Sequence, residues 1–392
     1  MELAPIFGTC DGVPCSPNIA FMKLLAPLLA CAMLTTAVKA ADATFYLGTY
    51  TRPGKSQGIY VGKLDTESGK LGPIKLAAEA KNPSFVALSP NGKFLYAAME
   101  AEGGAVGAFA VQPDGTLRAL NQASTGGGGA CHVWVDATGR TVLAANYGGG
   151  SIAAFPAKPD GSLGERSAFV QLTGTGPNKA RQEKPHAHSI YTDAANKFVY
   201  SPDLGTDNVW IFQLDAAKGT LTPTDPPSGK VPPGSGPRHL AIHPNGKLAF
   251  TCNEMAMTAT AFSRDPATGA LKEIETVSTL PAGTETKGLS TAEVFCHPTG
   301  KWLYVSNRTH DTIAVFSIAT DGKLKLIENA PAGVKVPRGF GIDPSGRWLI
   351  AGGQDDNRIA VHRIDPASGK LTLTSETAEV GSPVCVLFAP SK

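Results

Sequence analysis

The sequence predicts an all-β fold, a seven-bladed β-propeller, and repeated turn signatures carry that prediction. A Gly-x-Leu signature recurs seven times, at steps of 46 to 58 residues, and reads as a hairpin turn leading into a strand. Its glycines are Gly69, Gly115, Gly161, Gly219, Gly269, Gly322 and Gly369. Four short strands in each unit of about 50 residues are typical of a propeller blade.

A second turn recurs between alternating β-rich runs, such as residues 85–88 before it and residues 94–97 after it. Its clear copies centre on Gly92, Gly139, Gly246, Gly300 and Gly346, with a degenerate copy at Asn196 and a shortened one at Pro390-Ser391-Lys392. This also makes seven copies. A pair of β-sandwiches, the alternative fold, would not produce seven copies in phase.

The two ends of the predicted domain complement one another. Residues 44–50 look like the strand that follows the second turn, and residues 383–388 look like the strand that precedes it. We therefore expect one blade to be shared between N- and C-terminal strands, which closes the ring and protects its edges.

Composition agrees with this architecture and narrows the function. The chain has 44 Gly and 30 Pro among 392 residues, and only 17% of its residues are charged. A net charge of +2 with no basic run argues against nucleic acid as the main partner. Cys131, Cys252, Cys296 and Cys385 are scattered singly without a CxxC pair. We expect buried free thiols there, without a zinc or redox signature.

The first 40 residues read as an export signal. Met22, the expected true start, and Lys23 precede an apolar stretch over residues 24–34, and residues 38–40 form a small-x-small cleavage site. We expect cleavage after Ala40, a single propeller domain over residues 41–392, and a periplasmic or secreted protein. Lipoprotein processing at Cys31 and an N-terminal core helix are the alternatives. The apolar stretch is too short to span a membrane.

Polar residues recur at a fixed distance from the second turn. Arg238 and Glu254 lie eight residues either side of Gly246, and Arg338 and Gln354 lie eight either side of Gly346. Further members at seven or eight residues are Glu100, His132, Tyr147, His188, Glu293 and Arg308. A strand rises about 3.3 Å per residue, so these positions share one rim of the disc, roughly 25 Å from the turns. Mutual ion pairing at the channel mouth is the purely structural explanation.

Familiar catalytic motifs are missing from the sequence. It has no G-x-S-x-G elbow, HExxH or EF-hand loop. His186 and His188 are spaced to face one side of a strand, but no third metal ligand is evident. We expect no metal and no cofactor.

The chain resembles the lactonase family of seven-bladed propellers, which includes propeller-type 6-phosphogluconolactonase and carboxy-muconate lactonizing enzyme. The matching stretches lie at residues 130–133, 185–189, 236–239, 253–254, 292–293, 306–308 and 337–340. The resemblance implies lactone chemistry without a required metal, with active-site positions at His188, Arg238, Glu254 and Arg308. The expected export is a departure, because phosphorylated sugar lactones are not expected outside the cytoplasm.

The hypothesis is therefore an exported hydrolase that opens a sugar lactone or related lactone. Glu254 or His188 would be the general base, and Arg238 and Arg308 would stabilise the oxyanion or a carboxylate. A second set is expected to line the site or contact substrate: Glu293, Arg338, His132, His186, His239 and Gln354. The alternatives are a non-catalytic envelope propeller that binds an anionic ligand or a protein, and a muconate-type cycloisomerase. The sequence leaves the oligomeric state open.

Overall fold

The computed structural model describes residues 42–51, 55–101 and 103–390. The predicted signal region, residues 1–40 with Cys31 and Ala40, lies outside the described residues, as do Ser391 and Lys392 of the last turn. Within the described ranges every regular element is a β-strand, which confirms the all-β prediction. No helix among these residues has the length and apolarity needed to cross a membrane.

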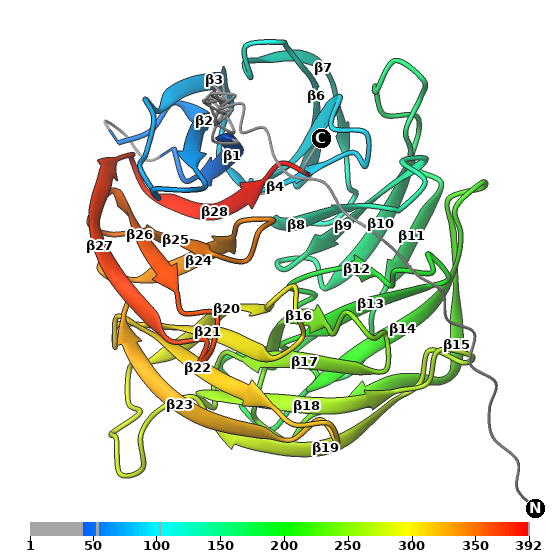
Figure 1. The fold of residues 1–392 in the computed structure, drawn as a ribbon. Coiled ribbons are helices and arrows are strands. Elements are labelled where there is room, and N and C mark those ends of the chain that lie inside the picture. Colours follow the sequence, from blue (N-terminus) through cyan, green and yellow to red (C-terminus); the bar gives the residue numbers. More distant parts are fainter. Residues whose placement is uncertain (1–41, 52–54, 102, 391–392) are drawn as a thin grey trace, which may run out of the picture. The chain divides into compact units, whose positions relative to one another are not determined.

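The strands form seven four-stranded antiparallel sheets arranged around a central axis as the blades of a propeller (Figure 1). Six blades are continuous in sequence. The first two are β4 (Pro83–Leu88), β5 (Phe94–Met99), β6 (Ala105–Val111) and β7 (Leu117–Ser124), and then β8 (Ala130–Val135), β9 (Thr141–Asn146), β10 (Ser151–Pro156) and β11 (Ala168–Gln171). The next two are β12 (Tyr191–Thr192), β13 (Phe198–Asp203), β14 (Asn208–Asp215) and β15 (Thr220–Lys230), and then β16 (Pro237–Ile242), β17 (Leu248–Asn253), β18 (Thr258–Arg264) and β19 (Leu271–Ser278). The last two are β20 (Ser290–Cys296), β21 (Trp302–Arg308), β22 (Thr312–Ile318) and β23 (Leu324–Pro331), and then β24 (Pro337–Ile342), β25 (Trp348–Gly353), β26 (Arg358–Ile364) and β27 (Leu371–Glu379).

The seventh blade is shared between the two ends of the chain, as predicted. It combines β28 (Pro383–Phe388) with β1 (Asp42–Thr49), β2 (Gly58–Asp65) and β3 (Lys75–Glu79), in the order β28-β1-β2-β3. β28 and β1 pair antiparallel, with Phe45 opposite Phe388. In Figure 1 the red C-terminal strand therefore lies beside the blue N-terminal one. This pairing leaves neither end of the ring as an open sheet edge.

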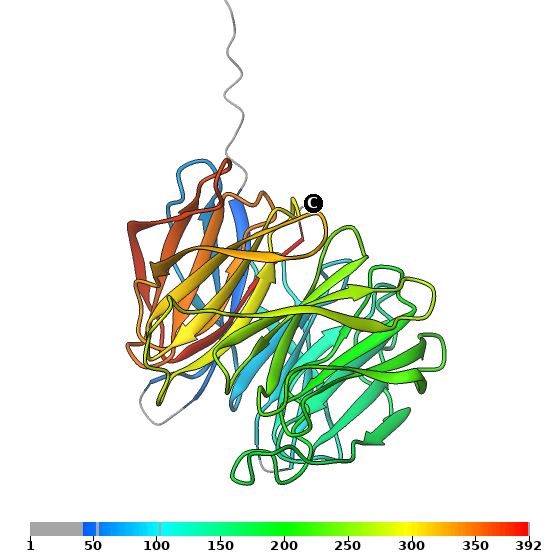
Figure 2. The same cartoon turned by 90° about the horizontal axis from the view of Figure 1, so that it is seen from below.

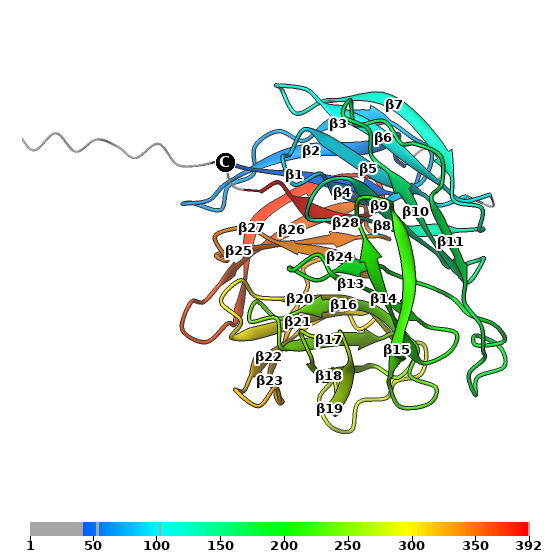
Figure 3. The ribbon, with the colours of Figure 1, turned by 90° about the vertical axis from the view of Figure 1, so that its right-hand side faces the viewer.

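The apolar core lies between neighbouring blades, where inward side chains of adjacent sheets pack face to face. Views along the other two axes show the stacked, twisted blades edge-on (Figures 2 and 3). A recurring hydrogen bond crosses these interfaces: the hydroxyl of a buried tyrosine on a second strand donates to the carbonyl of a Gly-x-Leu glycine in the next blade. The pairs are Tyr46–Gly115, Tyr96–Gly161, Tyr200–Gly269 and Tyr304–Gly369, at 2.8 to 3.1 Å.

Gly369 illustrates why glycine is required at this turn. Its φ of +73° lies in the left-handed region. A Cβ there would also approach the ring of Trp302, on the preceding blade, to 2.4 Å. The turn signature thus serves packing between blades as well as chain reversal.

The innermost hairpin of most blades carries a β-bulge near the start of its first strand. In β16, Pro237 pairs with Asn253 and His239 pairs with Cys252, so Arg238 is the extra residue. The same shift leaves Cys131 extra in β8 and Arg338 extra in β24. Bulges re-aim side chains and are frequent beside active sites.

Candidate functional site

A polar cavity of about 250 Å³ lies at the end of the inner hairpins opposite the second turn. Its lining comprises Glu100, Cys131, Tyr147, Arg181, His188, Glu254, Arg308 and Arg338. Six of the residues expected at this rim therefore face one another: Glu100, Tyr147, His188, Glu254, Arg308 and Arg338. They come from six different blades, which explains why only the closed ring assembles them.

The strand ends and bulges place these side chains. Glu254 follows β17 directly, and Arg308 is the last residue of β21. Arg338 and Cys131 are bulge residues of β24 and β8. Arg238, the bulge residue of β16, reaches the cavity through its contact with Glu254.

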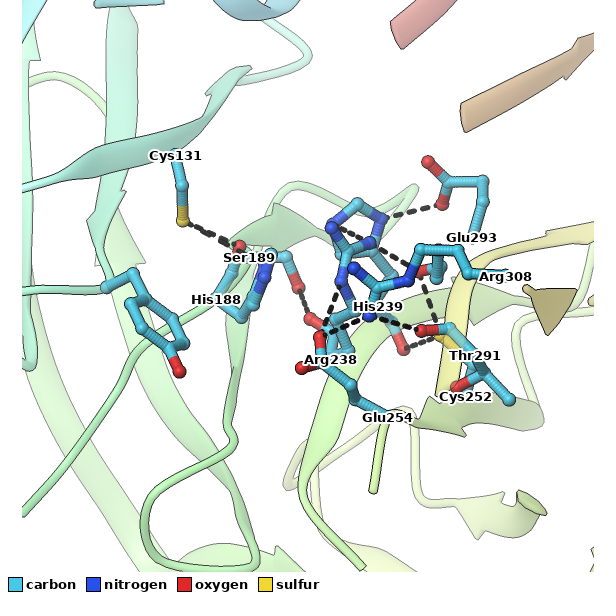
Figure 4. A network of polar contacts seen from close by, with 12 residues as sticks. Cys131, His188, Ser189, Arg238, His239, Cys252, Glu254, Thr291, Glu293 and Arg308 are labelled. Atoms are coloured by element: carbon cyan, nitrogen blue, oxygen red, sulfur yellow. Dashed lines mark hydrogen bonds and ion pairs between the residues drawn. The ribbon is translucent and has the colours of Figure 1, made fainter. Parts of the chain in front are cut away.

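Glu254 is the charged centre of the site (Figure 4). Its Oε2 lies 2.9 Å from Arg308 Nη2 and 3.1 Å from Arg238 Nε, and its Oε1 lies 2.6 Å from Arg181 Nη2. Burial by itself would raise the pKa of Glu254. The charges of Arg308 and Arg238, together with Arg181, outweigh burial and lower this pKa to about 2. The carboxylate is ionised at every physiological pH and is a weak base, so it is best suited to hold the three guanidinium groups.

Arg238 is fixed from its other side by a buried chain of polar groups. Its Nη1 lies 3.2 Å from His239 Nε2 and also donates to the carbonyl of Ala292. His239 Nδ1 is in turn 2.7 Å from Glu293 Oε1. A guanidinium can only donate hydrogen bonds. His239 Nε2 is therefore an acceptor, and Nδ1 carries the hydrogen shared with Glu293.

His188 provides an uncharged imidazole on the cavity wall. It packs against the rings of Tyr147 and His239 at 5.3 and 5.4 Å. Its Nδ1 lies 3.9 Å from Cys131 Sγ, which leaves Nε2, at the other end of the ring, for the cavity. Burial and then the charge of Arg238 lower the pKa of His188 well below its usual value. The imidazole is thus unprotonated near neutral pH, as a general base must be.

Arg338 is held on the other side of the cavity, where its guanidinium lies 5.5 Å from the centre of the Tyr50 ring. The Tyr50 hydroxyl donates to Glu100 Oε2 at 2.9 Å. Burial would lower the pKa of Arg338, but Tyr50 and Glu100 hold it above its usual value. The cavity therefore carries permanent positive charge on two walls, from Arg308 and from Arg338.

Cys131 lines the cavity but is not set up as a nucleophile. Its Sγ donates to the carbonyl of His188 at 3.2 Å. Burial raises the pKa of the Cys131 thiol to about 12, so the reactive thiolate is not populated at neutral pH. Cys131, Cys252 and Cys385 are buried and free, as predicted, and Cys296 is free and partly buried.

Two residues expected at the site lie outside the cavity lining. Gln354 hydrogen-bonds its neighbour Asp355 at the exposed end of β25. His186 does not line the cavity: its Nδ1 contacts the carbonyl of Tyr147 at 2.9 Å, and its Nε2 lies 3.2 Å from Glu183. Residues 186 and 188 precede β12 and are not part of a regular strand, and both imidazoles pack against the Tyr147 ring, at 4.6 and 5.3 Å. No group of three potential metal ligands occurs among the described residues.

Three further residues expected to line the site, His132, His239 and Glu293, lie one layer below it. Each is seven residues before its turn glycine, whereas Cys131, Arg238 and Arg338 are eight before theirs. Successive side chains on a strand point to opposite sides, so a difference of one residue can separate a side chain in the cavity from one beneath it. His132 stacks on Phe85 with ring centres 4.0 Å apart, and it lies 5.3 Å from His239. These side chains form the floor of the cavity.

Arg181 is the site residue that the repeat spacing did not reveal. It belongs to the long segment between β11 and β12, which Gln182 anchors through hydrogen bonds to the Leu204 carbonyl and to Asp207 at 2.9 and 2.8 Å. A signal was nevertheless present: the step from Gly161 to Gly219 is 58 residues, the longest of the six. The longer step indicates an insertion in this blade, and the inserted segment carries Arg181 to the cavity.

The fold is a seven-bladed propeller with a polar, arginine-rich cavity at one end of its channel, and comparison with known proteins identifies the family. The model of the family described as "Lactonase, 7-bladed beta-propeller" matches residues 44–388. The chain belongs to this lactonase family, as the resemblance implied.

Proteins similar to this chain include two bacterial 6-phosphogluconolactonases. The one from Bacillus subtilis is 37% identical over 88% of this chain and 97% of its own length. The one from Formosa agariphila is 32% identical over 88% of this chain and 99% of its own length. Among solved structures, the periplasmic gluconolactonase of Pseudomonas aeruginosa has a TM-score of 0.83 at 27% identity and covers 89% of this chain and 99% of its own.

Proposed function

We propose that this lactonase hydrolyses a sugar lactone of the gluconolactone type, with His188 as the general base. The observation that carries the proposal is an uncharged imidazole on the wall of a cavity that Arg308 and Arg338 make positive. Lactone opening needs a base for water and a positive donor for the oxyanion, and this pairing supplies both.

The reaction proceeds in two proton transfers. Water attacks the lactone carbonyl carbon while His188 Nε2 takes its proton, and the carbonyl oxygen becomes an oxyanion beside Arg308 or Arg338. The bond from this carbon to the ring oxygen then breaks, and the leaving alkoxide takes the proton from the His188 imidazolium. The immediate products are a carboxylic acid and a free hydroxyl, and His188 is neutral again. The acid then releases its proton to solvent and becomes a carboxylate, and this proton is what a pH indicator reports.

Glu254 acts as a positioning residue in this scheme. The sequence left Glu254 and His188 as alternative bases. A carboxylate with a pKa of about 2, shared by Arg181, Arg238 and Arg308, has little affinity for a proton from water. Its charge keeps three mutually repelling guanidinium groups at one place.

The decisive experiment is a pH-indicator assay with glucono-δ-lactone, in which the spontaneous opening rate is subtracted. We expect saturable hydrolysis that falls by roughly 10²-fold or more in His188→Ala. Hydrolysis no faster than the blank across a panel of sugar lactones would favour the ligand-binding alternative. Conversion of muconate-type diacids, followed by ultraviolet absorbance, would favour the cycloisomerase.

We further propose that the enzyme is exported and that its substrate is not phosphorylated. The proposal is supported by the signal-like residues 22–40 and by the similarity to a gluconolactonase of Pseudomonas aeruginosa that is described as periplasmic. Mass spectrometry of the protein recovered from the periplasm should find an N-terminus at Ala41. Lipid-modified Cys31, or an uncut cytoplasmic chain, would contradict it. Glucono-δ-lactone should be preferred over its 6-phosphate by kcat/KM.

A further inference from the structure

The central channel has a second chamber on the far side of the cavity floor. Its volume is about 580 Å³, within the range of small-molecule pockets. Aromatic and aliphatic side chains from six inner strands line it, among them Phe85, Trp134, Tyr191, Phe295, Leu387 and Phe388. None of the residues that line the polar cavity lines this chamber.

The apolar lining of the chamber remains partly exposed. All six side chains named above are neither fully buried nor fully exposed. Elsewhere in the described chain, only Phe169 and Leu373 are large hydrophobic side chains in the exposed class, and both lie on outer strands. Uncovered apolar surface concentrated in one concavity marks a place where an apolar ligand gains free energy by displacing water.

One polar group is available at the inner end of the chamber. Glu293 lines it, and its Oε1 accepts hydrogen bonds from His239 and from the Val294 amide, at 2.7 and 3.0 Å. Neither of these bonds uses Oε2, and Figure 4 shows that oxygen without a dashed line. Burial raises the pKa of Glu293 to about 8, so at pH 7 the carboxyl is an uncharged donor and acceptor.

The remaining polar groups of the lining are already engaged. Asp193 is paired with buried Arg264, and Trp134 Nε1 donates to Thr192 Oγ1 at 3.0 Å. The described lining contains no Lys or Arg. An anion would therefore lose its hydration without a partner, whereas a neutral ring with one hydroxyl would bury its apolar faces and meet Glu293.

We propose that this chamber binds a small uncharged aromatic molecule that bears one hydroxyl or amide group, with the ring between the inner strands and the polar group at Glu293. The site is distinct from the polar cavity and does not depend on the reaction assigned to that cavity. Its occupant is small because the walls are the inner strands of the ring itself.

Isothermal titration calorimetry with 2-naphthol as the probe tests the proposal on the full mature protein. We expect saturable binding of one molecule per chain, and roughly tenfold or greater weakening for naphthalene-2-sulfonate, which adds a negative charge. Saturating gluconate, the product that the proposed function assigns to the arginine-lined cavity, should leave the affinity for 2-naphthol unchanged. Absence of saturable binding, equal affinity for the sulfonate, or displacement by gluconate would overturn the proposal.

Substitutions at the mouth of the chamber provide a second test of the proposed site. Ala194 and Ala137 are exposed lining residues, whereas Ala195 is exposed, adjacent and outside the lining. Ala194→Trp and Ala137→Trp should each weaken 2-naphthol binding by about tenfold, with Ala195→Trp as the matched control at wild-type affinity. Equal affinity in all three variants would refute the site. A wild-type dimer that 2-naphthol dissociates would make a second copy of the chain the occupant, and would also overturn the proposal.

Discussion

The two ends of the central channel are built from the same ring of blades and have opposite chemistry. The cavity end presents Arg308, Arg338 and the Glu254 carboxylate, and the chamber end presents aromatic rings around one uncharged carboxyl. The two spaces lie at different heights along the strands, and a shift of one residue along a strand moves a side chain from the cavity to its floor. A residue eight before the turn glycine, such as Arg238, serves the cavity, whereas its neighbour His239 forms the floor. A repeat fold can thus hold unlike sites back to back.

The largest expected effect tests the cavity side. His188→Ala should lower kcat/KM for glucono-δ-lactone by roughly 10²- to 10⁴-fold, because a positioned general base contributes about that much. His186→Gln is the matched control, since His186 lies two residues away but outside the cavity lining. It should stay within about twofold of wild type in the same assay. Full activity in His188→Ala would remove His188 from the mechanism.

The next largest effect is expected at Glu254, whose carboxylate pairs with three arginines. Glu254→Gln keeps the shape but leaves Arg181, Arg238 and Arg308 without a counter-charge, so we expect kcat/KM to fall by roughly 10²-fold. Steady-state kinetics measure this. Gln354→Ala, at another position eight residues after a turn glycine, should remain near wild type because Gln354 does not line the cavity. Equal behaviour of the two variants would mean that Glu254 does not organise the site.

Glu293, in the floor, should be revealed through the pH dependence of stability. Its pKa is raised from 4.5 to about 8 in the folded state. The stability contributed by the protonated carboxyl is therefore fully present below pH 4.5 and is lost as the pH rises to about 8. Glu293→Gln does not titrate. From pH 4.5 to 8 its unfolding free energy should rise relative to wild type by on the order of a few kcal/mol.

Urea unfolding at several pH values measures that difference. Glu285→Gln, the same substitution at an exposed loop position, is the control. A constant difference between Glu293→Gln and wild type over this pH range would show that Glu293 is ionised in the folded protein.

The smallest effect should come from the insertion that reaches over the cavity. Arg181 pairs with Glu254 but its side chain is 44% exposed, so solvent screens the pair. Arg181→Ala should raise KM about three- to tenfold and change kcat less. Lys179→Ala, on the same segment and outside the cavity lining, should leave both constants near wild type. A loss of kcat as large as that of Glu254→Gln would place Arg181 in the chemistry itself.

Much of the fold could be predicted because its signals are local and repeated. The left-handed glycines at both turn families occur where the spacing indicated. The shared blade followed from comparing the two ends with the internal copies, and β28 pairs with β1 accordingly. The rim that carries the polar residues was also predictable, since distance along a strand converts directly into height in the disc.

The errors within the site arise from details that no spacing count resolves. By spacing alone, positions seven and eight residues before the turn glycine are equivalent. In the structure, His132 and Glu293, at seven residues, lie in the floor, whereas Arg338, at eight, lines the cavity. The bulges that aim Cys131, Arg238 and Arg338 are visible only once strands are paired. Arg181 lies outside the repeat altogether.

The number of blades, the closure of the ring and the rim on which the polar residues gather could all be read from the amino-acid sequence. Each of these depends on turns and alternation within about 50 residues of chain. The three-dimensional packing of the blades determines which side chains meet, which carboxyl is ionised and which is neutral, and that the channel holds two separate spaces. Those properties depend on burial and on charges brought together from different blades. Glu254 and Glu293 are both buried glutamates near Arg238, yet contact with three guanidinium groups keeps the first charged, and burial beside His239 keeps the second neutral.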